Sequence, residues 1–416
     1  MEKLKGSCII GQSGGPTSTV NASVLGCVTA ALRSDCVTGV YGAAYGITGV
    51  LDDKLYDLTL EDPAELARMK YTPSAVLGSC RYKLADAMTD DTDYQRLLDV
   101  FKKYNVRYFF YNGGNDSMDT CSKISAFLTQ NDYECRVIGI PKTIDNDLAL
   151  TDHCPGYGSA AKFVATVCME VSLDAKVYNR GSVTVLEIMG RNAGWLTAAS
   201  ALSKREGLGP DLIYLPEVPF DLADFITDTE RVYEMQRDAV VAVSEGIRDK
   251  NGAYISSYFS DTSTDRDAFG HARMGGLAAS LANFAHTRIK TKARGIELSL
   301  LQRCAAHIAS AADIEEAYMA GRAAFEAAES GVSDKMVAFE RVPGPAYKCV
   351  TTFADLVDVA NAEKKLPREW INETGNGLLP PFIDYALPLI QGETALETEN
   401  GLPRFAKLKK IMTRDL

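Results

Sequence analysis

The feature that most constrains the fold is a repeated unit in which a short apolar run ends directly in a loop of glycines and polar residues. Seven apolar runs predict buried strands, at Ser7–Ile10, Val106–Tyr111, Arg136–Ile140, Ser182–Ile188, Leu212–Leu215, Ala239–Val243 and Lys335–Phe339. Helical patterns lie between them, at Ser18–Ser34, Ser159–Ala175 and Asp313–Ser330. The last has Asp313 as its expected N-cap. This alternation predicts an α/β fold built from doubly wound, mostly parallel sheets.

Five of these strands run into loops that carry the residues of a binding site. The loops read GQSGGPT, NGGNDS, PKTIDND, MGRNAG and SEGIR in chain order. In open α/β sheets, ligands bind outside the carboxyl ends of the strands. We therefore expect the five loops to converge on one site, and this convergence is stronger evidence than any single motif.

Size and charge exclude several classes of function. The chain has 416 residues, enough for two large domains, and 44 basic against 55 acidic residues give a net charge of −11. Such a charge disfavours nucleic acid and anionic membranes as partners. The ten cysteines are scattered, and the sequence has no signal peptide and no long apolar stretch. These features predict a cytoplasmic protein with reduced thiols.

The loop GQSGGPTSTVNAS places Gly14 and Gly15 at a strand-to-helix turn. Backbone N–H groups and a helix N-terminus suit a phosphate group. A glycine pair can also serve the turn alone, and the loop is neither a GxGxxG fingerprint nor a P-loop. Phosphate binding therefore stays one of two interpretations of this motif.

The loop PKTIDND packs a lysine, a threonine and two aspartates into residues 141–147. One carboxylate can accept a hydroxyl proton while the other helps to organise a metal or the base. The alternative is an Asx-rich surface loop. This pattern favours a reaction that moves a proton and a phosphoryl group.

Three arginines are candidates for binding phosphate. Arg191 follows a buried strand and a glycine in EIMGRNAGW, and Arg294 and Arg303 lie nine residues apart in KARGIELSLLQRC. The guanidinium group binds phosphate in a bidentate manner. On either side of an extended or turning segment, Arg294 and Arg303 can reach one phosphate; otherwise they are two surface charges.

Together these motifs resemble the phosphofructokinase family over nearly the whole chain. SGGPTSTVNA, GGNDS, PKTIDND, EIMGR, VSEGIR and LLQR occur in that family's order and spacing, and the set looks most like the pyrophosphate-dependent branch. The resemblance implies two α/β domains with the active site in the cleft between them. It places residues 1–156 and about 302–354 in a phosphoryl-donor domain, and residues 157–301 and about 355–416 in a fructose 6-phosphate domain.

The resemblance also implies roles for single residues. Asp145 would be the base for the 1-hydroxyl of the sugar, with Lys142, Thr143, Arg191 and Asp116 completing the catalytic set. The residues implied to hold pyrophosphate are Gly15, Arg81, Asp116 and Lys142. The residues implied to hold the sugar phosphate are Thr143, Ile144, Asp145, Met189, Gly190, Arg191, Glu245, Arg294, Leu300 and Arg303. The implied cofactor is Mg²⁺, near Asn115, and the implied assembly is a homo-oligomer, either a dimer or a tetramer.

Three departures from the family pattern stand out. The arginine that often lies shortly before the EIMGR strand does not align cleanly, and Arg180 is the nearest candidate. Asn115 stands where many members have an aspartate near magnesium, and a neutral amide is a weaker ligand for the metal. Leu300 occupies a position where relatives carry His or Tyr against the sugar phosphate. One polar contact is therefore missing or supplied elsewhere.

Asp116 points to the identity of the phosphoryl donor. ATP-using relatives usually have glycine there, which leaves room for the α-phosphate of the nucleotide. Two unit charges about 4 Å apart repel by roughly 4 kcal/mol at an effective dielectric constant near 20, which is about a thousandfold in affinity. Pyrophosphate has no third phosphate to repel, and Lys142 would neutralise the charge of this shorter donor.

The favoured interpretation is transfer of a phosphoryl group from pyrophosphate to the 1-hydroxyl of fructose 6-phosphate. An ATP-dependent 6-phosphofructokinase is the first alternative. A non-catalytic, sugar-phosphate-binding regulatory subunit is the second, and the presence of Thr143, Asp145 and Arg191 argues against it. A kinase of another acceptor, such as a nucleoside or a lipid, is the third.

Overall fold

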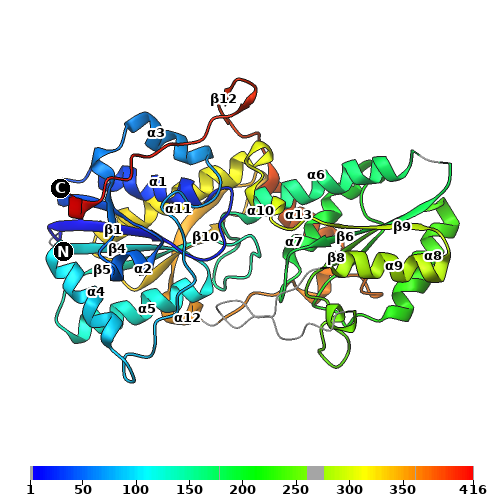
Figure 1. Ribbon diagram of the computed structural model, residues 1–416, viewed down its shortest axis with the longest axis horizontal. Coiled ribbons are helices and arrows are strands. Elements are labelled where there is room, and N and C mark those ends of the chain that lie inside the picture. The colour runs from blue at the N-terminus through cyan, green and yellow to red at the C-terminus, as the bar shows by residue number, and fades with distance from the viewer. Residues whose placement is uncertain (1–2, 178, 260–275, 361, 416) are drawn as a thin grey trace.

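The chain forms two α/β domains that lie side by side along the long axis of the molecule (Figure 1). The structure is a computed structural model and describes residues 3–177, 179–259, 276–360 and 362–415. Each domain is built around its own sheet, with helices on both faces. The predicted α/β fold with mostly parallel sheets is confirmed.

The sheet of the first domain has seven strands in the order β11-β10-β5-β4-β1-β2-β3. The strands are β1 (Gly6–Gln12), β2 (Val37–Ala43), β3 (Leu55–Asp57), β4 (Val106–Gly113), β5 (Arg136–Pro141), β10 (Lys335–Arg341) and β11 (Cys349–Asp355). The pairs from β10 to β2 are parallel, and the edge strands β3 and β11 are antiparallel to their neighbours. The carboxyl ends of β1, β4 and β5 therefore lie next to one another.

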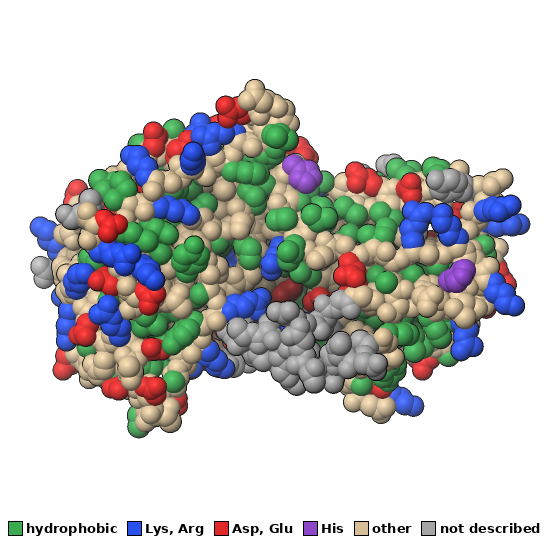
Figure 2. Space-filling model, in the orientation of Figure 1, with side chains coloured by type: hydrophobic (Ala, Val, Ile, Leu, Met, Phe, Trp, Pro, Cys, Tyr) green, Lys and Arg blue, Asp and Glu red, His purple; other side chains and the backbone are tan. Residues whose placement is uncertain are grey.

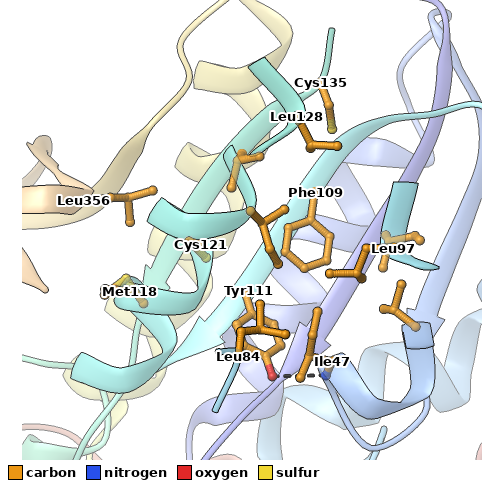
Figure 3. Packing of buried hydrophobic residues seen from close by; sticks show 14 of the residues in the cluster. Ile47, Leu84, Leu97, Phe109, Tyr111, Met118, Cys121, Leu128, Cys135 and Leu356 are labelled. Carbon is orange, nitrogen blue, oxygen red and sulfur yellow. Dashed lines mark hydrogen bonds between the residues drawn. The ribbon is translucent and has the colours of Figure 1, made fainter. Parts of the chain in front are cut away.

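Strand β4 shows why this sheet carries two separate cores. Its apolar side chains alternate between the faces, because successive residues of a strand point to opposite sides. Phe109 and Tyr111 pack among the residues of α4 (Thr92–Lys103) and α5 (Asn115–Gln130), and the Tyr111 hydroxyl accepts a hydrogen bond from Ile47 N at 3.1 Å (Figure 3). Tyr108 and Phe110 pack on the other face against α1 (Val20–Ala31) and α11 (Ala311–Glu329). A continuous apolar run is thus the pattern of a strand that is buried on both faces.

The sheet of the second domain has four parallel strands in the order β7-β8-β6-β9. They are β6 (Ser182–Ile188), β7 (Leu212–Tyr214), β8 (Asp238–Ser244) and β9 (Lys292–Glu297). Leu186 and Ile188 of β6 face the core formed with α6 (Tyr157–Ala175), α7 (Trp195–Ala198) and α13 (Pro380–Ala386). Val183 and Val185 face α8 (Leu222–Gln236) and α9 (Leu277–Ile289). The carboxyl ends of β6 and β8 are adjacent, as are those of β1, β4 and β5 in the first domain.

The helices are α1 (Val20–Ala31), α2 (Ile47–Leu51), α3 (Pro63–Arg68), α4 (Thr92–Lys103), α5 (Asn115–Gln130), α6 (Tyr157–Ala175), α7 (Trp195–Ala198), α8 (Leu222–Gln236), α9 (Leu277–Ile289), α10 (Leu301–Cys304), α11 (Ala311–Glu329), α12 (Leu356–Val359) and α13 (Pro380–Ala386). The short strands β12 (Thr398–Glu399) and β13 (Leu402–Pro403) form a hairpin near the C-terminus. Among the described residues, no helix has the length and apolar character needed to span a membrane.

The chain passes between the domains several times. After β11 it returns to the second domain, where Leu366, Phe382 and Leu389 join the core beside α6. The tail then runs back to the first domain, where Met412 forms an isolated antiparallel β-bridge with Tyr56. The backbone N–H groups of residues 409 and 410 donate hydrogen bonds to the carboxylate of Glu61. Residues 409, 410 and 412 of this tail therefore contact the first domain. The functional division into a donor domain and a sugar domain stays a prediction.

The N-cap of helix α11 lies three residues earlier than the sequence predicts. Its N-cap is Ser310, whose hydroxyl oxygen accepts a hydrogen bond from the backbone N–H of Asp313 at 3.4 Å. Asp313 is therefore not the N-cap. Its buried carboxylate instead accepts hydrogen bonds from the backbone N–H groups of Gly156 at 2.9 Å and Ser159 at 2.8 Å. The aspartate thus caps α6 of the other domain rather than its own helix.

Charged side chains of both signs are interspersed over the face of the first domain shown in Figure 2. Among the described residues on this face, there is no large patch of positive charge that would attract an anionic substrate. The positive charge required for a phosphate must therefore be concentrated locally, in a cleft.

Candidate active site

The five predicted loops line one cavity of about 800 Å³, with contributions from both domains. The loops after β1, β4 and β5 supply Ser13–Thr17, Gly114–Ser117 and residues 142–145 together with Asp147; those after β6 and β8 supply Met189, residues 191–193 and Glu245. Arg81, Arg303 and Glu363 complete the lining. The predicted convergence of strand ends is thus confirmed.

The loop after β1 brings bare backbone against two cations. Gly14 has a φ of +75°, which favours glycine, and a Cβ on Gly15 would lie 2.9 Å from a terminal nitrogen of Arg303. The ammonium group of Lys142 donates to the carbonyl of Gly15 at 2.6 Å. Since a side chain at either glycine would occupy this space, both glycines serve the cavity as well as the turn.

Burial changes the charge balance of this cluster. It lowers the pKa of Lys142 to about 8, because a charged ammonium loses hydration, while the nearby carboxylates of Asp145 and Asp147 act in the opposite direction. Burial also lowers the pKa of Arg303, and the positive charge of Arg81 adds to this effect. Crowded, poorly hydrated cations are suited to hold an anion.

Asp116 lies in the first turn of α5 and lines the cavity. A carboxylate at this end of a helix interacts favourably with the helix dipole. The side chain is exposed, and its neighbour Asn115 donates from the amide nitrogen to the carbonyl of Ala362 at 2.6 Å. Lys142 instead contacts Gly15 and lies near Asp145 and Asp147, so the structure does not show the predicted partnership of Asp116 with Lys142.

The loop after β5 holds Asp145 and Asp147 on either side of a strained residue. Asn146 has a φ of +55°, and its side chain is fixed at both ends. Its amide donates to the hydroxyl of Tyr385 at 2.8 Å, and its carbonyl accepts from Cys154 N at 2.9 Å. Within the loop, the hydroxyl of Thr143 accepts from Asp145 N at 3.1 Å. Because these contacts fix the backbone, the two carboxylates have defined positions.

Both carboxylates of this loop resist ionisation. Burial, followed by the negative charge of Glu245, raises the pKa of Asp145 above its ordinary value. Burial, followed by the charges of Asp145 and Glu363, raises the pKa of Asp147. A carboxylate with a raised pKa is a stronger base than an ordinary surface aspartate.

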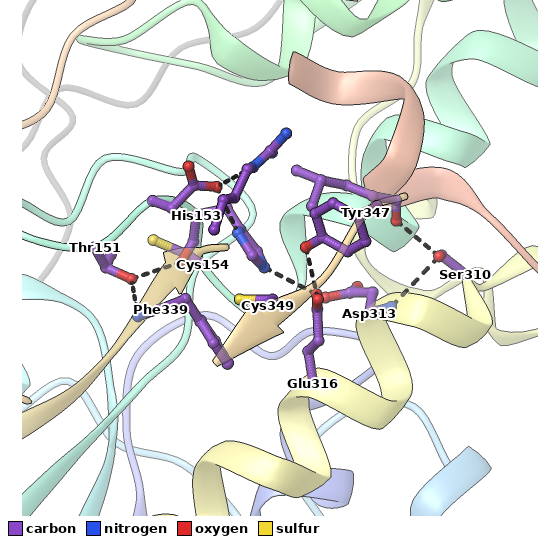
Figure 4. Close-up of polar contacts among 12 residues, drawn as sticks. Thr151, His153, Cys154, Ser310, Asp313, Glu316, Phe339, Tyr347 and Cys349 are labelled. Carbon is purple, nitrogen blue, oxygen red and sulfur yellow. Dashed lines mark hydrogen bonds and ion pairs between the residues drawn. The ribbon is translucent and has the colours of Figure 1, made fainter. Parts of the chain in front are cut away.

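A buried polar network anchors the end of this loop to the first domain (Figure 4). His153 lies between two carboxylates, with Nδ1 2.8 Å from Asp152 and Nε2 2.9 Å from Glu316. Burial lowers the pKa of His153, but these two hydrogen bonds outweigh it and raise the pKa above the ordinary value. Arg341 donates to Asp152 at 2.8 Å, and Tyr347 donates to Glu316 at 2.6 Å. The network holds the chain that leads from Asp147 into α6.

The second domain contributes a compact group after β6 and β8. The carboxylate of Glu245 accepts from Gly190 N at 3.4 Å, and the hydroxyl of Ser244 donates to the Gly190 carbonyl at 2.5 Å. The Nε of Arg191 is buried and has no hydrogen-bond partner among the described residues. Because a buried donor without a partner is costly, this nitrogen is suited to an anionic ligand.

The structure separates the two arginines that were expected to share a phosphate. Arg303 lines the cavity, whereas Arg294 lies in β9, pairs with Asp174 at 3.3 Å and is not part of the lining. Leu300 is 54% exposed and also lies outside the lining. Gly190 is placed through its contact with Glu245 rather than by lining the cavity directly. The predicted residues that do line the cavity are Gly15, Arg81, Asn115, Asp116, Lys142, Thr143, Ile144, Asp145, Met189, Arg191, Glu245 and Arg303.

Several lining residues were not predicted to belong to the site. Asp147 and Asn192 lie within motifs that were recognised, so proximity to the other site residues was the available signal. Glu363 follows no strand and belongs to no motif, and only the return of the chain after β11 brings it to the cavity. No sequence pattern indicates its position.

Two α/β domains whose strand ends enclose clustered cations and paired carboxylates define a phosphotransferase of the two-domain α/β class. The chain belongs to the phosphofructokinase family, whose family model matches residues 7–296.

Three relatives give the range of the similarity. The pyrophosphate–fructose 6-phosphate 1-phosphotransferase of Halomonas elongata is 42% identical over 96% of this chain and 95% of the relative. The sulfofructose kinase of Alkalicoccus urumqiensis is 31% identical over 92% of this chain and 97% of the relative. The crystal structure of the pyrophosphate-dependent phosphofructokinase from Marinobacter aquaeolei has a TM-score of 0.88 and 37% identity, and the match covers 99% of this chain and 97% of that one.

Proposed function

We propose that the chain transfers a phosphoryl group from pyrophosphate to the 1-hydroxyl of fructose 6-phosphate, giving fructose 1,6-bisphosphate and phosphate. The observation that carries this proposal is Asp116, a carboxylate in the wall of a cavity that also holds Gly15, Arg81 and Lys142. The relatives named above as pyrophosphate-dependent enzymes support the same donor.

In the proposed reaction, Asp145 accepts the proton of the 1-hydroxyl. The hydroxyl oxygen forms a bond to the nearer phosphorus of pyrophosphate, the bond from that phosphorus to the bridging oxygen breaks, and phosphate leaves. Lys142 and Arg191 offset the negative charge that moves during transfer. Arg303 holds the 6-phosphate, while Met189, Gly190 and Glu245 hold the sugar.

The residues of the cavity fit Mg²⁺ as the cofactor. Mg²⁺ prefers oxygen ligands and is usually bound by one or two carboxylates together with substrate phosphates. Asp147, Asp145 and the amide of Asn115 provide oxygen atoms in the same cavity. When bound, Mg²⁺ would neutralise phosphate charge and orient the donor.

The deciding experiment is an assay of the purified protein with pyrophosphate and with ATP as donors, at equal Mg²⁺ and with fructose 6-phosphate as acceptor. We expect a clear preference for pyrophosphate. A preference for ATP would establish the first alternative, and an absence of turnover with both donors would favour the regulatory subunit. Sulfofructose, tested as a second acceptor, checks the choice of sugar.

We also propose at least a dimer. Arg294 lies outside the cavity of its own chain with its side chain 38% exposed, so it is available to a second copy. We expect a cytoplasmic enzyme, and this expectation rests on the sequence alone.

A further inference from the structure

Residues 362–364 form a short connecting segment that touches the loops of the proposed donor site. The backbone N–H of Lys364 donates to the carbonyl of Asp147 at 2.7 Å, and Glu363 forms an isolated antiparallel bridge with Leu148. The ammonium group of Lys364 donates to the carbonyls of Thr151 and Asp152 at 3.1 and 2.7 Å. The segment is therefore fixed alongside the loop that carries both catalytic-site aspartates.

The same segment is fixed to the loop after β4. The amide nitrogen of Asn115 donates to the carbonyl of Ala362 at 2.6 Å, immediately before Glu363. The carboxylate-bearing residue Glu363 and the neutral Asn115 thus line the same cavity on two segments held together. An asparagine can make this contact because its amide is a donor, whereas an ionised aspartate cannot.

We infer that Glu363 is a metal-holding residue, which binds the divalent cation of the donor together with Asp147 and supplies the negative charge that Asn115 lacks. This inference rests on the proposed function, since the cation accompanies pyrophosphate. Glu363 reaches the site through the fold and not through a motif.

The electrostatics of the cavity agree with this role. Asp145, Asp147 and Glu363 place three carboxyl groups in the wall of the same cavity. Three carboxylates that repel one another are stabilised by a divalent cation between them.

The test is a Mn²⁺ titration of the purified protein, followed by water-proton relaxation, with Mn²⁺ alone and with Mn²⁺ plus methylenediphosphonate. Four proteins are compared: wild type, Glu363→Gln, the matched control Glu369→Gln, and the double variant Asn115→Asp/Glu363→Gln. Glu369 is an exposed glutamate six residues after Glu363 in the chain, and it lies outside the cavity lining. Because Glu363 is also exposed, Glu363→Gln should leave the folded core intact, and thermal unfolding checks this.

We expect Glu363→Gln to weaken Mn²⁺ binding by about 10-fold or more, as losses of metal-supporting groups commonly do. Glu369→Gln should bind like wild type, and the double variant should recover most of the lost affinity. Equal Mn²⁺ affinity in Glu363→Gln and Glu369→Gln would overturn the inference. These readouts involve no turnover, so a wild type that prefers ATP would refute the proposed donor without deciding the role of Glu363.

Discussion

Replacing Asp116 separates the two ways in which this carboxylate can select the phosphoryl donor. Asp116→Gly removes both the charge and the volume of the side chain, whereas Asp116→Asn removes only the charge. The position lies in the first turn of α5 and faces the cavity, so neither change affects a core contact. Glycine in a helix costs roughly 0.5–1 kcal/mol of stability relative to alanine, which a thermal unfolding control should register.

The exposure of Asp116 sets the size of the expected effect. At about 4 Å the repulsion of two unit charges is roughly 4 kcal/mol near an effective dielectric constant of 20, but only about 1 kcal/mol in bulk water. Because Asp116 is exposed, the charge component should lie toward the lower value, or roughly 5-fold in kcat/KM for ATP. A larger gain in Asp116→Gly than in Asp116→Asn would then measure the contribution of space.

The assay is the kcat/KM for pyrophosphate and for ATP in wild type and in both variants, at two salt concentrations. Asp119→Asn, on the same helix, is the matched control for a charge change in α5. We expect the ratio of ATP to pyrophosphate use to rise in both Asp116 variants. The charge component should shrink at high salt. If the ratio is the same in wild type, Asp116→Asn and Asp116→Gly, Asp116 is a turn residue without a role in donor choice.

Four further predictions address the roles of single residues and the assembly. Asp145→Asn should lower kcat by about 10²–10⁴-fold while sugar binding persists, because the hydroxyl proton then has no acceptor; a kcat within a few-fold of wild type would exclude Asp145 as the base. Arg303→Ala should raise the KM for fructose 6-phosphate by about 10- to 150-fold, since a charge-assisted contact contributes roughly 1.5–3 kcal/mol, and an unchanged KM would remove Arg303 from the site. Activity should increase as pH rises through the raised pKa of Asp145, and it should fall above about pH 8, where Lys142 of the unliganded enzyme loses its proton. Lys142→Arg should abolish the fall at alkaline pH, because arginine stays charged. If the fall persists in that variant, it belongs to another group. Light scattering at assay concentration should give at least a dimer, and loss of sugar affinity in Arg294→Ala would support a contribution across the interface.

The sequence predicts the buried strands well and the edges poorly. All seven predicted strands are present, because a strand covered on both faces has a continuous apolar run. The strands that were missed are β2, β3, β9, β11 and the two short strands β12 and β13. Strand β9 has the sequence KARGIE and is partly exposed along its length, and β11 is a half-exposed edge strand. Their pairing depends on neighbours that local apolarity does not reveal.

The residues of the candidate site fall into two groups: those whose position follows from a nearby strand end, and those whose position depends on distant parts of the chain. Residues that follow strand ends, such as Lys142 and Arg191, line the cavity because parallel strands deliver their loops to one edge of the sheet. Arg294 was expected to reach one phosphate together with Arg303, but strand β9 places it beside Asp174, away from the cavity. Glu363 was missed because its position depends on how the chain passes between the domains after β11. The spacing of residues in the sequence does not predict that path.

The opposite pKa shifts of Asp145 and Lys142 have a common origin in the depth of the cavity. Burial penalises the charged form of each group, so it raises the pKa of the Asp145 carboxyl and lowers the pKa of the Lys142 ammonium. The pKa values of both groups therefore lie nearer to neutral pH, where each group can gain or lose a proton at little cost in free energy. An anionic donor would favour the charged form of Lys142, and a divalent cation would favour the ionised form of Asp145. Binding of a metal–pyrophosphate pair would thus set both groups in the states that transfer requires, which couples assembly of the site to its chemistry.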